Sequence, residues 1–330
     1  MTVINAATVN AAIVGIGWWG QKIVTAVQGK STRMRFLRGV SKEPDDVRAF
    51  TMRHGITLTT ELSDVLQDPQ VQAVVLATPH SLHTEQIIAC AKAGKAVFCE
   101  KPLALNKADA VRSTRACREA GVVLGLGTNK RFWPSMRELK RVVDSGVLGE
   151  ILHIEGHYSN ENTNRHFSSW RTDPAEAPGA GLTGSGIHVL DALVSLAGPA
   201  KRIYAQALSR RPQPDPLDTI TVAFEFANGI SATLGAMRST PLVWRIHVFG
   251  DTGSVEAVGE TELVVRSKGG KVERLNFDPV DSLLAEFDAF AGAVAGGPAY
   301  PVPLTQMVDG VAAFAAIVQS MAVREAVAVD

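Results

Sequence analysis

Two short segments of the sequence carry side chains that can move protons. The first contains Glu100-Lys101-Pro102, and the second runs from Gly186 through His188 to Asp191. The Lys101 ammonium can hydrogen-bond a substrate oxygen and stabilise negative charge that develops on it. Histidine titrates near neutral pH, so His188 can give or take a proton. Asp191 follows three residues later, close to the same helical face, and is a candidate to orient the imidazole ring.

Residue chemistry alone leaves a structural alternative for each of these groups. Lys101 can pair with Glu100 on the surface ahead of a proline turn, and such exposed pairs contribute little. His188 precedes an apolar helical stretch, Val189 to Leu196, where a histidine is often a cap or a core residue.

A glycine-rich loop indicates a dinucleotide site. Gly15-Ile16-Gly17-Trp18-Trp19-Gly20 follows an apolar strand, Ala12 to Val14, and opens a predicted helix, Gly20 to Gln28. Glycines in this context permit a tight turn, and pyrophosphate can then bind the free N–H groups at the helix N-terminus. We therefore expect Gly15, Gly17, Trp18, Trp19 and Gly20 to contact the cofactor. A glycine turn without a ligand is the alternative.

The end of the second predicted strand bears on the choice of cofactor. NAD-binding proteins tend to have an acid about 20 residues past the glycines, where it accepts a hydrogen bond from the ribose 2′-hydroxyl. Here that place reads Val40-Ser41-Lys42. A hydroxyl and an ammonium accommodate a 2′-phosphate, so we expect NADP, bound in part by Ser41 and Lys42. Glu43 lies close enough to keep NAD as the alternative.

Apolar strands and amphipathic helices alternate from residue 11 to residue 128, which is typical of a doubly wound parallel sheet. The expected strands are Ala12 to Val14, Phe36 to Val40, Ala73 to Ala77, Val97 to Phe98 and Val122 to Leu126. The expected helices are Gly20 to Gln28, Pro44 to His54, Thr84 to Ala93 and Lys107 to Ala120. Ligands bind at the carboxyl ends of such strands. The residues expected to contact the cofactor there are Thr78, Pro79, His80, His83, Glu100 and Lys101.

The pattern changes after residue 128, so we expect two domains, 1–128 and 129–330. Alternating strands at Ile151 to Tyr158, Thr219 to Phe226, Ile230 to Arg238 and Leu242 to Phe249 predict a mostly antiparallel sheet. Asn228-Gly229 lies between two of them and predicts a hairpin. Helices are expected at Ser282 to Val294 and Thr305 to Ala322.

Composition narrows the class of partner. The 330 residues include 33 basic and 33 acidic side chains, so the formal net charge is zero. The chain as a whole therefore has no excess of positive charge to attract nucleic acid. The apolar runs are interrupted and shorter than the ~20 residues of a membrane span. The residues Met1 to Asn10 do not resemble a signal peptide, and the three cysteines lack metal-ligand spacing. We therefore expect a cytoplasmic protein without a metal that acts on a small molecule.

Taken together, these segments resemble the glucose-fructose oxidoreductase and inositol dehydrogenase (Gfo/Idh/MocA) family. The resemblance covers nearly the whole chain. It rests on the glycine loop, Thr78-Pro79-His80, Glu100-Lys101-Pro102, Arg131-Phe132-Trp133-Pro134, Gly149-Glu150-Ile151, Trp170-Arg171 and Gly186 to Asp191. It implies a Rossmann domain followed by an α/β domain whose large, open, mostly antiparallel sheet often forms the dimer interface, and hence a homodimer or homotetramer.

The resemblance also implies roles for the two proton-moving groups. Lys101 would contact both the substrate hydroxyl and the nicotinamide, and His188 would act as acid or base beside the same ring. Pro102 would follow a cis peptide bond, as in many relatives. One position departs from the family: relatives of the inositol dehydrogenase kind commonly carry an aspartate where this chain has Gly184, so the role of Asp191 stays open.

The polar segment Tyr158 to Arg171 suits a polyhydroxylated substrate, since Asn160, Asn162, Asn164, Arg165 and His166 offer donors and acceptors. The expected substrate contacts are Lys101, Arg131, Asn160, Trp170, Arg171, His188 and Asp191. The sequence therefore predicts an NAD(P)-dependent oxidoreductase acting on a carbonyl or secondary alcohol of a sugar or polyol. The alternatives are a dihydrodiol-type dehydrogenase, a dinucleotide-sensing regulator without catalysis, and redox-assisted glycosidic cleavage.

Overall fold

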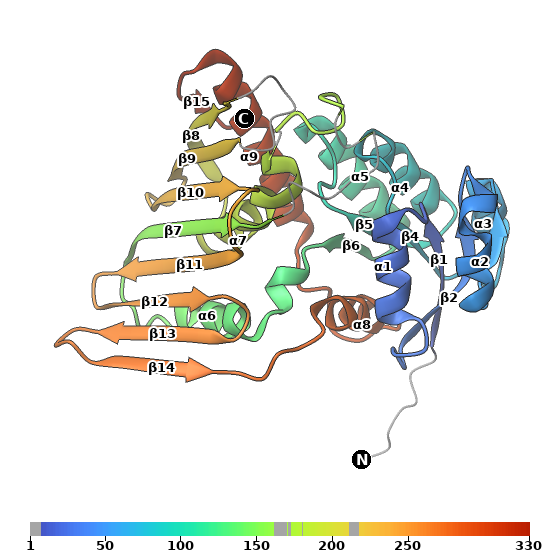
Figure 1. Cartoon of the computed structure of the whole chain (residues 1–330), viewed down its shortest axis with the longest axis horizontal. Helices are drawn as coiled ribbons and strands as arrows, with labels where there is room; N and C mark the ends of the chain where they lie inside the picture. The colour runs from blue at the N-terminus through green and yellow to red at the C-terminus, as the bar shows by residue number, and fades with distance from the viewer. Residues whose placement is uncertain (1–7, 162–169, 171–172, 180, 211–217) are drawn as a thin grey trace. The chain divides into compact units, whose positions relative to one another are not determined.

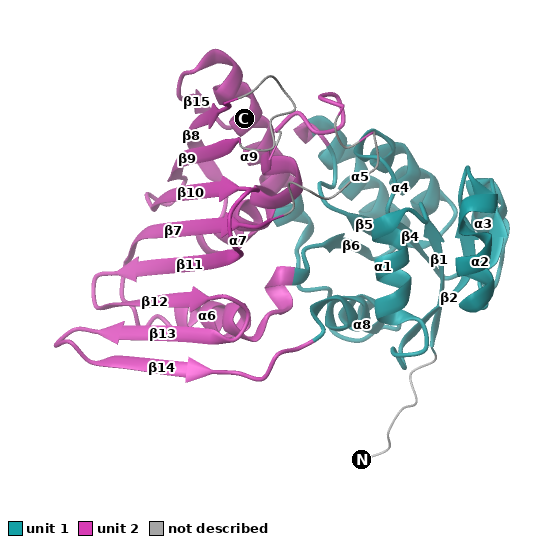
Figure 2. Ribbon diagram, viewed as in Figure 1, with its two compact units in different colours: residues 1–104, 108–129, 281–307 teal, residues 105–107, 130–280, 308–330 magenta. Residues whose placement is uncertain are grey.

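A computed structural model describes residues 8–161, 170, 173–179, 181–210 and 218–330 of the chain. Contacts divide it into two compact units (Figure 2). The first comprises residues 1–104, 108–129 and 281–307, and the second comprises 105–107, 130–280 and 308–330. The expected division after residue 128 differs from these units, because residues 281–307 return to the first.

The first unit is built on a six-stranded parallel sheet of order β3-β2-β1-β4-β5-β6 (Figure 1). Its strands are β1 (Val9–Val14), β2 (Met34–Val40), β3 (Thr57–Thr59), β4 (Ala73–Leu76), β5 (Ala96–Glu100) and β6 (Leu124–Gly127). Every residue of β4 is fully buried, as expected of a strand covered on both faces. Strand order reverses between β1 and β4, and ligands bind at this point in such sheets.

The expected elements of the first unit are confirmed to within a few residues. Its helices are α1 (Trp18–Val27), α2 (Pro44–Arg53), α3 (Leu62–Gln67), α4 (His83–Lys92), α5 (Lys107–Ala120) and α8 (Ser282–Val294). The sequence missed β3 and α3. Both are short, and each buries few side chains, so neither leaves a clear apolar period.

The second unit holds a nine-stranded sheet of order β14-β13-β12-β11-β7-β10-β9-β8-β15. The strands are β7 (Ile151–Ser159), β8 (Ala200–Leu208), β9 (Thr219–Phe226), β10 (Ser231–Met237), β11 (Val243–Gly250), β12 (Gly253–Val258), β13 (Glu262–Ser267), β14 (Val272–Asn276) and β15 (Val327–Ala328). The mostly antiparallel sheet is confirmed; β7 and β10 pair in parallel. Asn228-Gly229 joins β9 to β10 as predicted, with Gly229 at φ +85°.

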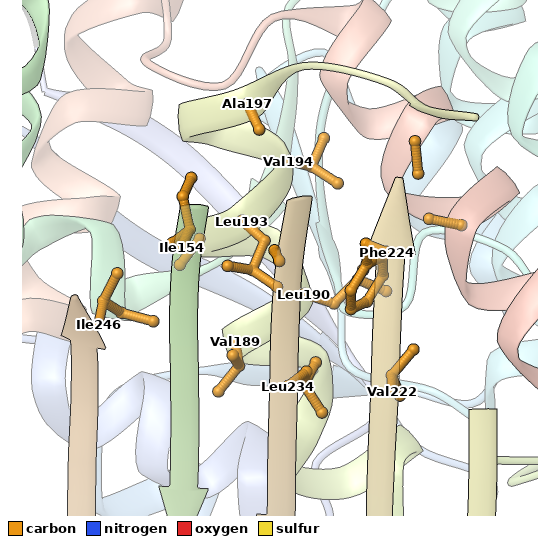
Figure 3. Close-up of a cluster of buried hydrophobic side chains, with 14 of the residues drawn as sticks. Ile154, Val189, Leu190, Leu193, Val194, Ala197, Val222, Phe224, Leu234 and Ile246 are labelled. Atoms are coloured by element: carbon orange, nitrogen blue, oxygen red, sulfur yellow. The ribbon is translucent and has the colours of Figure 1, made fainter. Parts of the chain in front are cut away.

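Helices cover one face of this sheet. The helix α7 (Ile187–Ala197) lays Leu190, Leu193 and Val194 on side chains of the central strands, among them Ile154 and Phe224 (Figure 3). The helix α6 (Pro134–Asp144), which the sequence did not predict, packs on β12 and β13. This apolar layer fixes the start of α7, where His188 lies.

The last helix, α9 (Leu304–Val323), was expected and is long and apolar enough to cross a membrane. Its Ala313, Phe314 and Ile317 are buried in the core of the second unit. A buried core helix has the same composition as a membrane span, so this helix alone is weak evidence for a membrane.

The buried carboxylate of Glu286 on α8 holds the end of β6 in the first unit. Its Oε1 accepts a hydrogen bond from the Thr128 backbone N–H at 2.6 Å and lies 3.3 Å from the Tyr300 hydroxyl. The same hydroxyl donates to the Leu126 carbonyl at 2.8 Å. Phe290 of α8 also packs against Phe98 of β5. Residues 281–307 are therefore part of this unit's core.

Replacing Glu286 by Ala should destabilise the protein by about 1–3 kcal/mol, because the buried Thr128 N–H loses its acceptor. Urea unfolding of the variant measures the change. Glu119→Ala, at an exposed carboxylate on α5, is the control and should shift the free energy of unfolding by less than about 0.5 kcal/mol. Equal stabilities for the two variants would contradict the assigned role.

Candidate active site

The glycine loop between β1 and α1 is packed backbone against backbone. Gly15 has φ +88°, and a Cβ on it would lie 2.6 Å from the Ala77 carbonyl oxygen. A Cβ on Gly20 would lie 2.1 Å from the Gly15 carbonyl oxygen. By contrast, a Cβ on Gly17 would meet none of the described atoms within 4 Å. Gly15 and Gly20 thus shape the loop, and Gly17 leaves the approach to it open.

The first turn of α1 suits an anionic group. Gly17 is its N-cap and has no side chain to cap the turn. Trp18 is 45% exposed, and the Lys22 ammonium lies 4.7 Å from the centroid of its ring. Trp19 is half-buried, and its indole N–H meets no acceptor within the described part of the chain. A helix N-terminus, a cation and exposed aromatic surface fit a dinucleotide.

At the end of β2, Ser41 and Lys42 have different surroundings. Ser41 is largely buried, and its hydroxyl donates to the Glu43 carbonyl at 3.3 Å. Lys42 is exposed. Of the two residues expected to meet a 2′-phosphate, Lys42 is therefore the one whose side chain reaches solvent.

The loops after β4 and β5 hold the next group of expected residues. Thr78 donates through its hydroxyl to Gln86 at 2.6 Å. His80 is buried and its ring packs edge-on against that of His83, with the ring centroids 5.7 Å apart. His83 has no exposed surface, and its ring nitrogens contact the Pro102 and Thr78 carbonyl oxygens. The His83 ring therefore supports these loops from within.

Glu100 and Lys101 end β5 in a constrained setting. Glu100 is buried against Gly127, where a Cβ would lie 2.8 Å from its Oε1. The Lys101 backbone N–H donates to Glu100 Oε2 at 3.3 Å. The Lys101–Pro102 peptide bond is cis, as the resemblance implied. The Glu100 carboxylate thus holds the backbone of this segment by accepting a hydrogen bond from it.

In the second unit, Arg131 and Asp191 form a bidentate ion pair. Arg131 donates through Nε and Nη2 to the two carboxylate oxygens, each at 2.7 Å, and both side chains are about 15% exposed. Asp191 was a candidate to orient His188. Its carboxylate instead receives the planar fork of Arg131, the geometry in which such pairs are strongest. Arg131 in turn fastens the turn Asn129–Phe132 to α7.

Lys130, which sequence reasoning missed, lies among three aromatic rings. Its ammonium is 3.7 Å from the Trp133 ring centroid, 4.4 Å from that of Tyr158 and 5.0 Å from that of Trp244. Cations bind ring faces at such distances. The Tyr158 ring also meets the His188 ring edge-on, with centroids 6.3 Å apart. No motif signals this cluster, because its rings come from three separate elements.

Buried polar groups surround the turn before His188. Asn160 donates through its amide to the Ser185 hydroxyl at 2.9 Å. Burial raises the pKa of Tyr158, an effect that its hydrogen bond with Asn160 opposes, so the phenol stays protonated at neutral pH. Residues Leu182–Gly186 form a π-helical turn, a feature often found at functional sites. A Cβ on Gly184 would meet no described atom within 4 Å.

An ion pair fixes the same turn from its other side. Asp218 is 1% exposed, and its Oδ2 accepts from the Gly181 N–H and from Arg238, both at 3.0 Å.

Among the remaining expected residues, Trp170 is described, and its carbonyl accepts from the Asp173 N–H. Arg171, Asn162, Asn164, Arg165 and His166 lie outside the described residues.

The described residues contain no group of three or more His, Cys, Asp or Glu that could hold a metal ion. Cys90, Cys99 and Cys117 are buried free thiols. Burial raises the pKa of Cys90 to about 12, so this thiol stays protonated and unreactive at neutral pH.

Comparison with known proteins gives matches over both units. Residues 9–128 match the model of an oxidoreductase family with an NAD-binding Rossmann fold. Residues 136–256 match the model of the GFO/IDH/MocA C-terminal domain. Both agree with the resemblance seen in the sequence.

Individual relatives are more distant. The chain is 31% identical to myo-inositol 2-dehydrogenase of Thermotoga maritima over 63% of each protein. It is 28% identical to trans-1,2-dihydrobenzene-1,2-diol dehydrogenase of Bos taurus, over 67% of this chain and 66% of that protein. The matches thus span slightly less than two thirds of the length of these two relatives.

Solved structures match almost the whole chain. An oxidoreductase from Desulfitobacterium hafniense described as NADPH-dependent has a TM-score of 0.87 at 25% identity and covers 98% of both chains. Levoglucosan dehydrogenase in complex with NADH and levoglucosan has a TM-score of 0.86 at 21% identity, covering 98% of this chain and all of that one. At such identities, the likeness to levoglucosan dehydrogenase concerns the fold alone.

Two alanine substitutions test the glycine loop. Gly17→Ala should leave thermal stability unchanged, yet weaken dinucleotide binding at least about tenfold, because its Cβ enters the space through which pyrophosphate approaches the backbone. Gly20→Ala should lower both stability and binding, since its Cβ overlaps the Gly15 carbonyl. Thermal denaturation and fluorescence titration with NADPH and NADH measure the two effects. Unchanged binding in Gly17→Ala would argue against this loop as the site.

Proposed function

The chain belongs to the Gfo/Idh/MocA oxidoreductase family, and on that premise we propose that it transfers a hydride between a nicotinamide dinucleotide and a carbonyl or secondary alcohol of a small polyhydroxylated compound. One observation carries the proposal. The glycine loop, Thr78 and Lys101 follow three strands that are neighbours in one parallel sheet, β1, β4 and β5. Their carboxyl ends lie at one edge, where such sheets bind ligands.

The bound dinucleotide supplies or accepts the hydride. Lys101 hydrogen-bonds the substrate oxygen, and its positive charge stabilises the alkoxide-like charge that develops there during transfer. The oxygen gains a proton on reduction and loses one on oxidation. Lys101 and His188 share that proton movement.

The surroundings of His188 favour a division of labour. Asp191, one turn along α7, is bound to Arg131, so this carboxylate is committed to the ion pair. Tyr158 meets the His188 ring by an edge. Lys101 is accordingly the main proton donor in carbonyl reduction, and His188 chiefly contacts the substrate.

A sugar or polyol is the proposed substrate class. Asn160, Trp170, Arg171 and Arg131 supply polar contacts and an apolar platform of the kind that binds hydroxylated rings. The relative named for myo-inositol supports this class. The Bos taurus relative favours a second candidate, the oxidation of a diol on an unsaturated ring. A substrate screen followed at the nicotinamide absorbance separates them; binding without any turnover would favour a dinucleotide-sensing regulator.

NADP is the proposed cofactor, in a cytoplasmic homodimer or homotetramer assembled through the nine-stranded sheet. Exposed Lys42 offers a cation to a 2′-phosphate, and Ser41 stands where NAD-binding proteins tend to place an acid. The D. hafniense structure described as NADPH-dependent supports this choice. NAD is the alternative, since the neighbouring Glu43 can accept a hydrogen bond from a ribose 2′-hydroxyl.

Replacing Lys101 by Met should lower kcat at least about 100-fold, because the ammonium that serves the substrate oxygen is removed. Dissociation constants for the dinucleotide should stay within about threefold. Lys92→Met, at an exposed position at the end of α4, is the control and should behave as wild type. A fully active Lys101→Met enzyme would refute the assigned role.

The proposed cofactor preference predicts a smaller dissociation constant for NADPH than for NADH. Lys42→Glu should weaken NADPH binding at least about tenfold and change NADH binding much less, since a carboxylate repels the 2′-phosphate. Fluorescence titration of both dinucleotides gives the ratio. Lys268→Glu makes the same charge change on an exposed turn of the second unit and should leave the ratio unaltered. A clear preference of the wild type for NADH would overturn the assignment.

A further inference from the structure

His83 is a buried polar residue that the proposed mechanism does not use. It begins α4, and none of its surface is exposed. Nδ1 lies 2.8 Å from the Pro102 carbonyl oxygen, and Nε2 lies 3.1 Å from the Thr78 carbonyl oxygen. The ring therefore links two backbone segments that are 24 residues apart in the chain.

Both carbonyl oxygens accept hydrogen bonds and cannot donate them, and a neutral imidazole has a single N–H. We assign that proton to Nδ1, which makes the shorter contact, so Pro102 receives the hydrogen bond and Nε2 only contacts the Thr78 carbonyl. Thr78 and Pro102 follow β4 and β5, which pair side by side through Leu76 and Cys99. The imidazole thus spans the two loops at the carboxyl ends of neighbouring strands.

The bond to Pro102 acts on the residue before it. The ring of Pro102 restricts its φ angle, so little rotation is left between its carbonyl group and its nitrogen. A hydrogen bond to that carbonyl therefore also restrains the peptide bond that joins Lys101 to Pro102. On the other side, the Lys101 N–H donates to buried Glu100. Leu103 and Ala104, which follow, are buried as well. The backbone on both sides of Lys101 is therefore held in place.

We propose that His83 is a positioning residue for Lys101: by hydrogen-bonding the Pro102 carbonyl, it sets where the lysine side chain leaves the loop. This inference rests on the proposed function, which assigns the proton chemistry to Lys101. The His83 ring is fully buried, and its two nitrogens lie against backbone carbonyl oxygens, which favours a role in holding the loops.

Two amide substitutions separate the two contacts of His83. The side-chain nitrogen of asparagine can occupy the place of Nδ1, and that of glutamine the place of Nε2. His83→Asn should keep the bond to Pro102 and retain kcat within about threefold, whereas His83→Gln should lose that bond and lower kcat at least about tenfold. KM and the dinucleotide dissociation constant should change little in either variant.

His153 offers a matched control. It lies on β7 in the second unit, and its Nδ1 is 2.7 Å from the Ser231 hydroxyl. His153→Asn and His153→Gln should leave kcat unchanged. Equal kcat values for His83→Asn and His83→Gln, or a loss that appears only in thermal stability, would overturn the proposal.

Two measurements do not depend on turnover. Lysine residues carrying ¹³C-methyl groups give separate resonances, and Lys101→Arg identifies that of Lys101. This resonance should shift in His83→Gln and stay in place in His83→Asn; an unmoved resonance in His83→Gln refutes the positioning role. In the wild type, ¹⁵N spectra should find Nδ1 of His83 protonated at neutral pH. An unprotonated Nδ1 rules out the hydrogen bond to Pro102 and so refutes the proposal, even if a variant does not fold. A wild type without hydride transfer on any substrate would instead count against the proposed function.

Discussion

The candidate site of the first unit depends on a contact between backbones that no side chain can enter. Gly15 lies against the peptide after β4, and Gly20 lies against Gly15 itself, at separations that leave no room for a methyl group. Because of these contacts, α1 starts close to the sheet, directly after the carboxyl end of β1. The loops that carry Thr78 and Lys101 emerge at the same edge. The backbone contacts of Gly15 and Gly20 therefore determine where the residues of the candidate site lie.

Elements that bury a continuous or regular apolar face could be predicted from the sequence. The bounds of α5, α8 and β9 agree with the prediction, since each carries a clear period or lies beside a turn signal. The strand β14, Val272–Asn276, was missed because most of its side chains are exposed. The helix α6 begins at Pro134 within a motif, and the motif hid the helical period that follows.

The candidate site was predictable as a set of loops but not as a set of contacts. Motifs located Lys101, His188 and the glycines, because each stands at the end of a recognisable element. They could not reveal that Asp191 pairs with Arg131, or that Lys130 lies among rings as far away in sequence as Trp244. These contacts depend on the order of the strands in the sheet, and a local sequence pattern does not predict that order.

The return of residues 281–307 to the first unit bears on how the protein can be dissected. A fragment ending near residue 129 would lack α8. The aromatic ring of Phe98 would then be exposed, and the Thr128 N–H would lose its acceptor, Glu286. A minimal dinucleotide-binding module would have to join residues 8–129 to 281–307 through a designed linker. Exchange of substrate domains between relatives would likewise need two splice points instead of one.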